Sequence, residues 1–154
     1  MKRINAIKNI MEGITNEIVV TSAGKISREV HYIKDRPENF YVQGSMGATL
    51  GISIGLALNK PDRKIKVIIG DGEALMSLDT MVLMKKLNLP NLELIILDNN
   101  QYQSTGGQKT LSDSVDFRLF CYCKVIFVTD SEVEVPRIMI PHKHLTKRFM
   151  NAIK

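Results

Sequence analysis

The chain of 154 residues has only two cysteines, and no second pair of metal-ligating side chains accompanies them. Cys121 and Cys123 are separated by Tyr122, the alternation typical of a strand or of the entry to one. Two thiols alone do not make a zinc site. We therefore expect both cysteines to be buried and chemically inert.

Long apolar runs are also absent. None approaches the roughly 20 residues that a membrane helix requires, and the basic N-terminus leads into an amphipathic pattern instead of the apolar core of a signal peptide. Hydrophobic residues make up 44% and charged residues 24% of the chain, which is ordinary for a soluble globular domain. We expect one cytoplasmic domain over residues 1–154, without membrane association.

The chain lacks the aromatic and basic modules of nucleic-acid-binding proteins, although its formal net charge is +5. Its Lys and Arg residues are spread along the chain, except for a C-terminal cluster at Lys143, Lys147, Arg148 and Lys154. A solvated helix face explains this cluster best; docking of an acidic partner or attraction of anionic substrates is the alternative. A dinucleotide-binding module is not expected, because no Gly-x-Gly-x-x-Gly follows the first expected strand.

Hydrophobic periodicity predicts alternating strands and helices. Strands are expected at 17–22, 40–42, 64–70, 92–97 and 124–128, and helices at 2–13, 27–33, 47–59, 74–87 and from about 143. The third and fourth strands are too uniformly apolar for a sheet with one solvated face. They predict an α/β fold in three α/β/α layers, with a mostly parallel sheet. Small residues in helix 47–59 predict very close packing against a neighbour.

Two polar motifs follow the third and fourth expected strands. These are Gly70-Asp71-Gly72 and Asp98-Asn99-Asn100, at the carboxyl ends of strands, where ligands bind in such folds. Taken singly, each motif is a common turn or loop. Together, Asp71, Asn99 and the carbonyl of Gln101 offer the oxygen ligands that a hard dication bridging a diphosphate needs. Glycines beside the aspartate would let phosphate approach the backbone, and a helix start would aim N–H groups at it.

The two motifs and their spacing resemble the diphosphate-binding, C-terminal half of thiamine diphosphate (ThDP) enzymes. Further segments are similar to phosphonopyruvate decarboxylase and the beta subunit of sulfopyruvate decarboxylase, namely 24–29, 35–37, 40–47, 56–63 and 104–110. The similarity runs from about Ile18 to Phe117. It implies the ThDP-binding fold, ThDP and Mg²⁺ as cofactors, and decarboxylation of 3-phosphono- or 3-sulfopyruvate to an aldehyde and carbon dioxide.

The resemblance also implies roles for single residues. The carbonyl of Gly44 would accept a hydrogen bond from the 4'-amino group of the pyrimidine, and Met46 would be the apolar wedge between the two cofactor rings. Ser45 would lie near the diphosphate or the pyrimidine. Gly72 and Glu73 would present backbone N–H groups to phosphate oxygens. Gly70, Asp71, Gly72, Asn99 and Gln101 complete the expected cofactor site, with Asp71, Asn99 and Gln101 on the metal.

Glu73 departs from the small Ala or Ser of the relatives. Its carboxylate would repel a diphosphate unless it points to solvent or reaches a cation, although its charge suits a helix N-terminus. Beyond the metal loop, Tyr102 and Ser104 are possible substrate-side residues, with Gly106-Gly107 keeping their loop flexible. A tyrosine at position 102 is closer to the sulfopyruvate decarboxylases, whereas the Gly-Gly-Gln that follows is closer to the phosphonopyruvate decarboxylases.

One catalytic role is missing. ThDP enzymes need a glutamate on a separate pyrimidine-binding domain, for which this chain has no room, and Glu29 lies in a segment of the diphosphate half. No complete set of catalytic residues is therefore expected in this chain. We expect a pyrimidine-binding partner subunit to complete the site, and a homo- or hetero-oligomer with helix 47–59 or 74–87 at the interface.

The last third departs from the pattern of the family. The relatives have a helix and a strand after about residue 128, and a gap this short cannot supply a crossover. The organisation expected is an N-terminal helix at 1–13, core sheet and helices at 18–128, and a shortened tail with a final helix at 129–154. The sheet should be one strand short or have an irregular edge. A degenerate, non-catalytic interaction subunit with the ThDP fold is therefore the alternative function.

Overall fold

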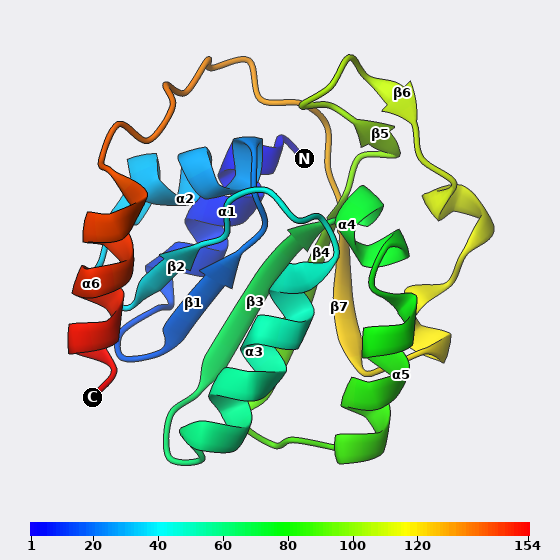
Figure 1. Cartoon of the computed structure of the whole chain (residues 1–154). Helices are drawn as coiled ribbons and strands as arrows, with labels where there is room; N and C mark the ends of the chain where they lie inside the picture. The colour runs from blue at the N-terminus through cyan, green and yellow to red at the C-terminus, as the bar shows by residue number, and fades with distance from the viewer.

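Five parallel strands form the central sheet of the computed structural model, which describes residues 1–154 (Figure 1). Their order across the sheet is β2-β1-β3-β4-β7. The strands are β1 (Ile18–Thr21), β2 (Asn39–Tyr41), β3 (Ile65–Gly70), β4 (Leu92–Asp98) and β7 (Cys123–Phe127). The helices are α1 (Arg3–Glu12), α2 (Lys25–Lys34), α3 (Ala48–Asn59), α4 (Asp71–Leu75), α5 (Leu78–Leu87) and α6 (His142–Ala152). None of these helices has the length and hydropathy needed to cross a bilayer.

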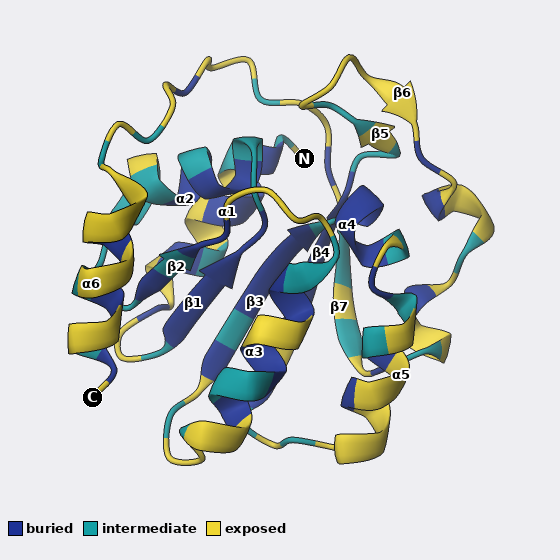
Figure 2. Ribbon diagram, in the orientation of Figure 1, coloured by how far each residue is buried: buried dark blue, intermediate teal, exposed yellow.

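The sheet is buried on both faces, which explains its continuous apolar strands. Alternate side chains of a strand point to opposite faces. In β4, Ile96 packs into the cluster under α3 and α5, and Ile95 packs into the cluster under α1 and α2. Figure 2 shows the dark, buried strands between helices whose outer sides are exposed. The three-layer α/β/α fold with a parallel sheet is therefore confirmed.

The expected helix 74–87 is two helices instead of one. A short α4 begins at Asp71 and ends at Leu75, and α5 begins at Leu78. Ser77 between them has non-helical dihedral angles, and its hydroxyl donates to the carbonyl of Glu73 at 2.7 Å. Gly47 packs so tightly here that a Cβ would lie 2.8 Å from the carbonyl oxygen of Met76. Long-range packing against the start of α3 therefore accompanies the break.

Close packing of α3 differs from the expectation. Gly47, just before the helix, is the tightly packed glycine, whereas a Cβ at Gly51 or Gly55 would meet nothing within 4 Å. Gly51 is exposed and Gly55 is half-buried, four residues apart on the same side of the helix. The small residues there leave open space on the outer side of α3 instead of close contact with another element of this chain.

The chain from Val128 to Pro141 contains no helix or strand, and β7 is the edge of the sheet next to β4. A single bridge, between Lys2 and Thr129, ties this segment to the start of α1. An antiparallel hairpin, β5 (Gln101–Tyr102) and β6 (Gln108–Lys109), was not expected. The two cysteines differ too: Cys121 is buried, but Cys123 is only partly buried, and a hydrogen bond from Cys121 lowers the pKa of Cys123.

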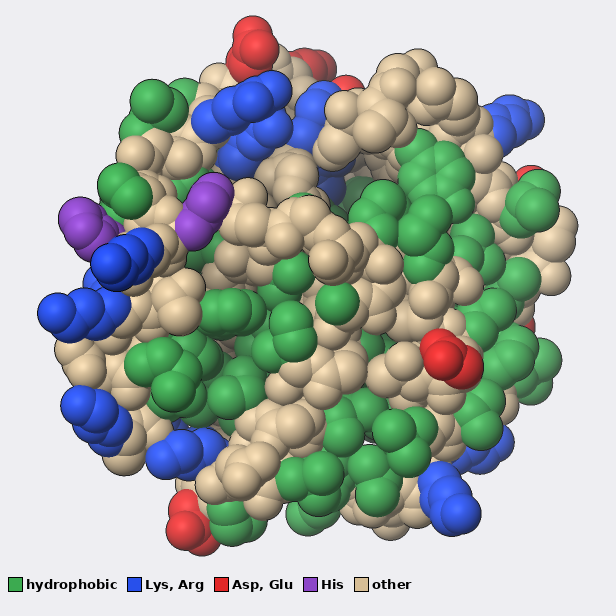
Figure 3. Space-filling view, in the orientation of Figure 1, with side chains coloured by type: hydrophobic (Ala, Val, Ile, Leu, Met, Phe, Trp, Pro, Cys, Tyr) green, Lys and Arg blue, Asp and Glu red, His purple; other side chains and the backbone are tan.

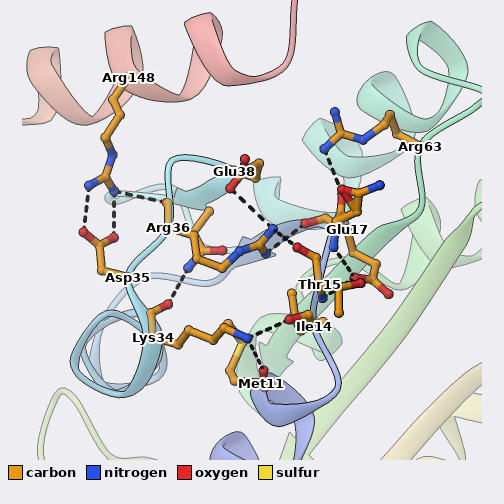
Figure 4. Close-up of polar contacts among 12 residues, drawn as sticks. Met11, Ile14, Thr15, Glu17, Lys34, Asp35, Arg36, Glu38, Arg63 and Arg148 are labelled. Atoms are coloured by element: carbon orange, nitrogen blue, oxygen red, sulfur yellow. Dashed lines mark hydrogen bonds and ion pairs between the residues drawn. The ribbon is translucent and has the colours of Figure 1, made fainter.

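Polar contacts fix α6 against the rest of the domain (Figure 4). Arg148, expected on a solvated face, makes two 2.7 Å hydrogen bonds to the carboxylate of Asp35. Arg36 donates to the carbonyls of Glu17 and Thr15, both at 3.0 Å. The Asp35-Arg36-Pro37 segment thus joins α6, α2 and the start of β1, which is a structural role.

Candidate cofactor site

A cavity of about 170 Å³ lies at the carboxyl edge of the sheet. It is lined by Arg3, 22–26, Met46, 70–73, Leu97, Asn99 and 101–105. Ligand pockets are usually about 300–1,000 Å³, and this one is smaller because the loop after β4 lies across it. The ring of Tyr102 occupies the space beside Gly72 that any side chain there would need. Ser104 packs closely on Gly24, because a Cβ at Gly24 would lie 2.6 Å from the hydroxyl oxygen of Ser104.

Two buried carboxylates meet at the ends of β3 and β4. Asp71 is 2% exposed and Asp98 is 6% exposed. The hydroxyl of Thr110 donates to Asp71 at 2.5 Å, and the hydroxyl of Ser112 donates to Asp98 at 2.9 Å. Burial, together with the charge of Asp98, raises the pKa of Asp71, although the hydroxyls oppose the shift. A dication would relieve this repulsion, so the residues fit a metal site.

The other two expected metal ligands lie beside Asp71 in the same cavity. The amide oxygen of Asn99 accepts from the backbone N–H of Gln101 at 3.3 Å, and Asn100 turns the chain through a left-handed conformation (φ 59°). No group of three His, Cys, Asp or Glu side chains exists that could hold a metal by itself. A cation here would therefore use the amide and backbone carbonyl oxygens as well as the carboxylate of Asp71.

Glu73 lines the cavity, but its carboxylate is held elsewhere. The side chain is 4% exposed, and its carboxylate accepts hydrogen bonds from the backbone N–H of Thr49 at 3.2 Å and the Thr49 hydroxyl at 2.6 Å. Thr49 lies in the first turn of α3, whose N-terminus has no cap from its own preceding residues. The charge that was expected to face solvent or repel phosphate is thus stabilised by a neighbouring helix.

The expected pyrimidine-side residues lie at an open rim. Met46 lines the cavity and is 46% exposed. Gly44 and Ser45 are exposed, do not line the cavity, and adopt left-handed backbone conformations with φ of 66° and 43°. The structure therefore brings Met46, the Gly70–Glu73 turn and the Asn99 loop together, and leaves the other two residues beside them.

Arg3, Thr110 and Ser112 were missed by sequence reasoning. Arg3 is 4% exposed and its guanidinium binds the buried carboxylate of Glu29 at 2.9 and 2.6 Å. It also donates to the side chain of Gln103 in the loop over the cavity. Nothing marks Arg3 in an amphipathic pattern, where it counts only as a polar residue. Thr110 did lie in a segment shared with relatives, which was the available signal.

Comparison with known proteins agrees with this architecture. Residues 20–121 match the family model described as thiamine pyrophosphate enzyme, C-terminal TPP binding domain. The sulfopyruvate decarboxylase subunit beta of Methanocaldococcus jannaschii is 48% identical over 110 residues, which cover 71% of this chain and 58% of that protein. The phosphonopyruvate decarboxylase of Streptomyces hygroscopicus is 44% identical over 98 residues, covering 64% of this chain and 24% of that protein.

A solved structure shows the same fold. Benzoylformate decarboxylase from Polynucleobacter necessarius superposes with a TM-score of 0.61 at 14% identity, covering 99% of this chain and 31% of that one. The chain thus spans 58% of the length of the Methanocaldococcus relative and less of the larger enzymes. The family model matches about two thirds of the chain, and the solved structure has the same fold. The chain therefore belongs to the C-terminal, thiamine pyrophosphate-binding domain family of thiamine pyrophosphate enzymes.

Proposed function

We propose that this chain is the diphosphate-binding subunit, or half, of a ThDP- and Mg²⁺-dependent decarboxylase. Its substrate is a 3-phosphono- or 3-sulfopyruvate, which is converted to an aldehyde and carbon dioxide. The observation that carries the proposal is the buried pair Asp71 and Asp98 at neighbouring strand ends, next to Asn99 and Gln101. Neither carboxylate forms an ion pair, since Arg3 and Lys25 of the cavity wall pair with other residues. The similarity to sulfopyruvate and phosphonopyruvate decarboxylases supports the substrate class.

Each part of the site would have a separate task. Bound ThDP supplies the carbon nucleophile and accepts the electrons released with carbon dioxide. Asp71, Asn99 and the carbonyl of Gln101 would hold the Mg²⁺, which would neutralise negative charge of the diphosphate. Gly72 would let phosphate reach the backbone once Tyr102 has moved aside, because its ring now lies on that glycine. The Gly106-Gly107 pair, at φ of 126° and 76°, would give the loop the freedom to open and close.

The open rim requires a second protein surface. The pyrimidine would be held on one side by Gly44, Ser45 and the half-exposed Met46. The other side of its binding site, with the glutamate, would come from a pyrimidine-binding partner subunit. The outer side of α3, with open space at Gly51 and Gly55, and apolar side chains on α5 would bind this partner. Figure 3 shows green, apolar side chains over this part of the molecule.

Calorimetric titration of ThDP with Mg²⁺ into the chain tests the cofactor site. Binding should require Mg²⁺ and be abolished in Asp71→Ala, whose circular dichroism spectrum should match the wild type. Asp113→Ala is the matched control, because it removes the same negative charge at an exposed position. Normal ThDP affinity in Asp71→Ala would exclude the metal assignment.

Turnover separates a catalytic subunit from a degenerate one. The chain alone should show negligible decarboxylation of phosphonopyruvate or sulfopyruvate, and co-purification with its pyrimidine-binding partner should restore it. Absence of both ThDP binding and partner-dependent turnover would favour the non-catalytic interaction subunit. Robust turnover by the isolated chain would contradict the shared site.

A further inference from the structure

Two cations lie in the wall of the cofactor cavity, and their surroundings differ. Arg3 is buried, and its guanidinium is bound to the carboxylate of Glu29. Lys25, at the start of α2, makes one ion pair, with Asp130 at 3.7 Å. The side chains of Lys25 and Asp130 are 39% and 52% exposed. An exposed pair at this distance contributes little stability. Lys25 and Asp130 both line a neighbouring cavity, where Asp130 also accepts from Arg3 at 3.4 Å. Lys25 thus lies between two cavities, and its ammonium is the one of the two cations that no buried carboxylate holds.

Lys25 and the proposed metal ligand Asp71 lie beside different residues of the loop after β4. Tyr102 packs on Gly72, which follows Asp71, and Ser104 packs on Gly24, which precedes Lys25. Gln103, between them, contacts Arg3. Lys25 therefore follows the glycine on which Ser104, an expected substrate-side residue, packs. Lys and Arg side chains gather in the upper part of Figure 3.

Resting on the proposed function, we propose that Lys25 binds the strong anion at carbon 3 of the substrate, a phosphonate or sulfonate, and so determines substrate specificity. The ammonium would turn from one exposed carboxylate, Asp130, to an anion enclosed in the cavity, where its hydrogen bonds are stronger. Arg3, held by Glu29, does not move. A 2-keto acid without the second anion gains nothing from Lys25.

The full chain and two probes test this assignment by calorimetry. The probes are Mg²⁺ with ThDP, and 3-phosphonopropanoate, which has the two anions of the substrate but no keto group to react. Lys25→Met should weaken binding of 3-phosphonopropanoate to the ThDP-loaded chain about tenfold, the loss of one charge-assisted hydrogen bond. Lys25→Arg should bind within about threefold of wild type, because the charge remains. The affinity for ThDP should be unchanged in both variants.

Arg28→Met is the matched control. Arg28 lies on the same helix and has the same charge, but it lines only the neighbouring cavity. An equal loss in Arg28→Met would reduce the effect to general electrostatics and overturn the assignment. A loss of ThDP affinity in Lys25→Met, with the analogue unaffected, would place Lys25 on the cofactor diphosphate instead. A wild-type chain that binds ThDP but not the analogue would exclude the subsite alone, whereas failure to bind ThDP would overturn the proposed function and this inference together.

Discussion

Two acidic side chains beside the cavity have opposite electrostatic surroundings. The carboxylate of Glu73 is stabilised by the N-terminus of α3, through the N–H and hydroxyl of Thr49. The carboxylate of Asp71 lies near the buried Asp98, and hydrogen bonds from hydroxyl groups and the backbone offset the repulsion only in part. The residue that departs from the family pattern is therefore the stabilised one, and the residue proposed to bind the metal is the destabilised one. Such a division is common where function opposes stability.

Asp71→Asn should stabilise the isolated chain while removing its metal site. Because the pKa of Asp71 is raised in the folded state, ionisation of this group costs stability as the pH rises from its ordinary pKa to the raised one. At neutral pH without Mg²⁺, the variant should melt a few degrees higher, about the shift that 1 kcal/mol gives. Thermal unfolding at pH 7 and below pH 4 is the measurement. An unchanged or lower melting temperature at pH 7 would contradict the repulsion.

Glu73→Ala should destabilise the chain by about 1–2 kcal/mol, because it leaves the N–H and hydroxyl of buried Thr49 without an acceptor. Glu73→Gln keeps an acceptor oxygen and should lose less than half of that. Urea unfolding measures both, and ThDP affinity should be equal or higher in each variant, since a negative charge near the diphosphate is removed. Equal stability of the wild type and Glu73→Ala would show that the carboxylate does not cap α3.

At the scale of elements, contacts distant in sequence decide where helices begin and how they are held. Gly47, the residue before α3, has a left-handed conformation (φ 92°) and packs against the carbonyl of Met76. A Cβ added at Gly55, further along the helix, would meet no atom within 4 Å. The fold therefore requires a glycine at position 47 but not at position 55, although in the sequence both are small residues of one expected helix.

Gly47→Ala and Gly55→Ala should change stability in opposite directions. The first introduces both a left-handed strain and a clash, and should cost more than about 1 kcal/mol. The second replaces a glycine inside a helix with open space around it, and should add about 0.5–1 kcal/mol to the free energy of unfolding. Urea unfolding of the two variants side by side is the measurement. Equal effects would contradict the tight junction at Met76.

The contact between α6 and α2 should make stability depend on pH. Burial raises the pKa of Asp35, but hydrogen bonds from Arg148 and Tyr41 outweigh it, so the net shift is downward. A lowered folded-state pKa gives stability that is full above the ordinary pKa and is lost as the pH falls through the lowered one. Asp35→Asn should thus cost up to about 1 kcal/mol at pH 7, since the pair is partly exposed.

Urea unfolding across the acid range measures this difference. It should shrink toward zero as the pH falls below the lowered pKa of Asp35, because both proteins then carry a neutral side chain. Asp113→Asn, which replaces an exposed carboxylate without an arginine partner, should show no such trend. A difference between wild type and Asp35→Asn that stays constant with pH would contradict the ion pair with Arg148.

For the whole molecule, the distribution of exposed apolar side chains indicates a surface that another protein subunit would cover. Met46, Ile52, Met76, Val82 and Leu83 are between 38% and 53% exposed. They lie at the cavity rim, on α3, between α4 and α5, and on α5. Large contiguous apolar patches are uncommon on soluble monomers. The same side of the molecule holds the open rim of the proposed cofactor site.

The purified chain should therefore be a homodimer or higher oligomer through α3 or α5, and should form a hetero-oligomer with its partner in the cell. Sedimentation equilibrium at micromolar concentration measures the mass. Ile52→Glu should shift the chain toward monomer, whereas Met139→Glu, at an exposed methionine between β7 and α6, should not. A clean monomer in which Met46 resists mild oxidation would contradict both the interface and the shared site.

The sequence by itself determined the order of helices and strands, the layered sheet, and the meeting of Asp71 with Asn99. Apolar periodicity is a local property, and two motifs that end neighbouring parallel strands must lie at one edge of the sheet. These expectations did not depend on the packing of any particular side chain.

Tertiary structure alone decided the capping of α3 by Glu73 and the position of Arg3 at the cavity. Each of these depends on a contact between residues 24 to 100 positions apart. The direction of a side chain across such a distance is set by how the layers pack, and no local pattern encodes it. The same reason applies to Lys25, a polar residue two positions before the helix expected at 27–33, which only the folded chain places in the wall of the cavity.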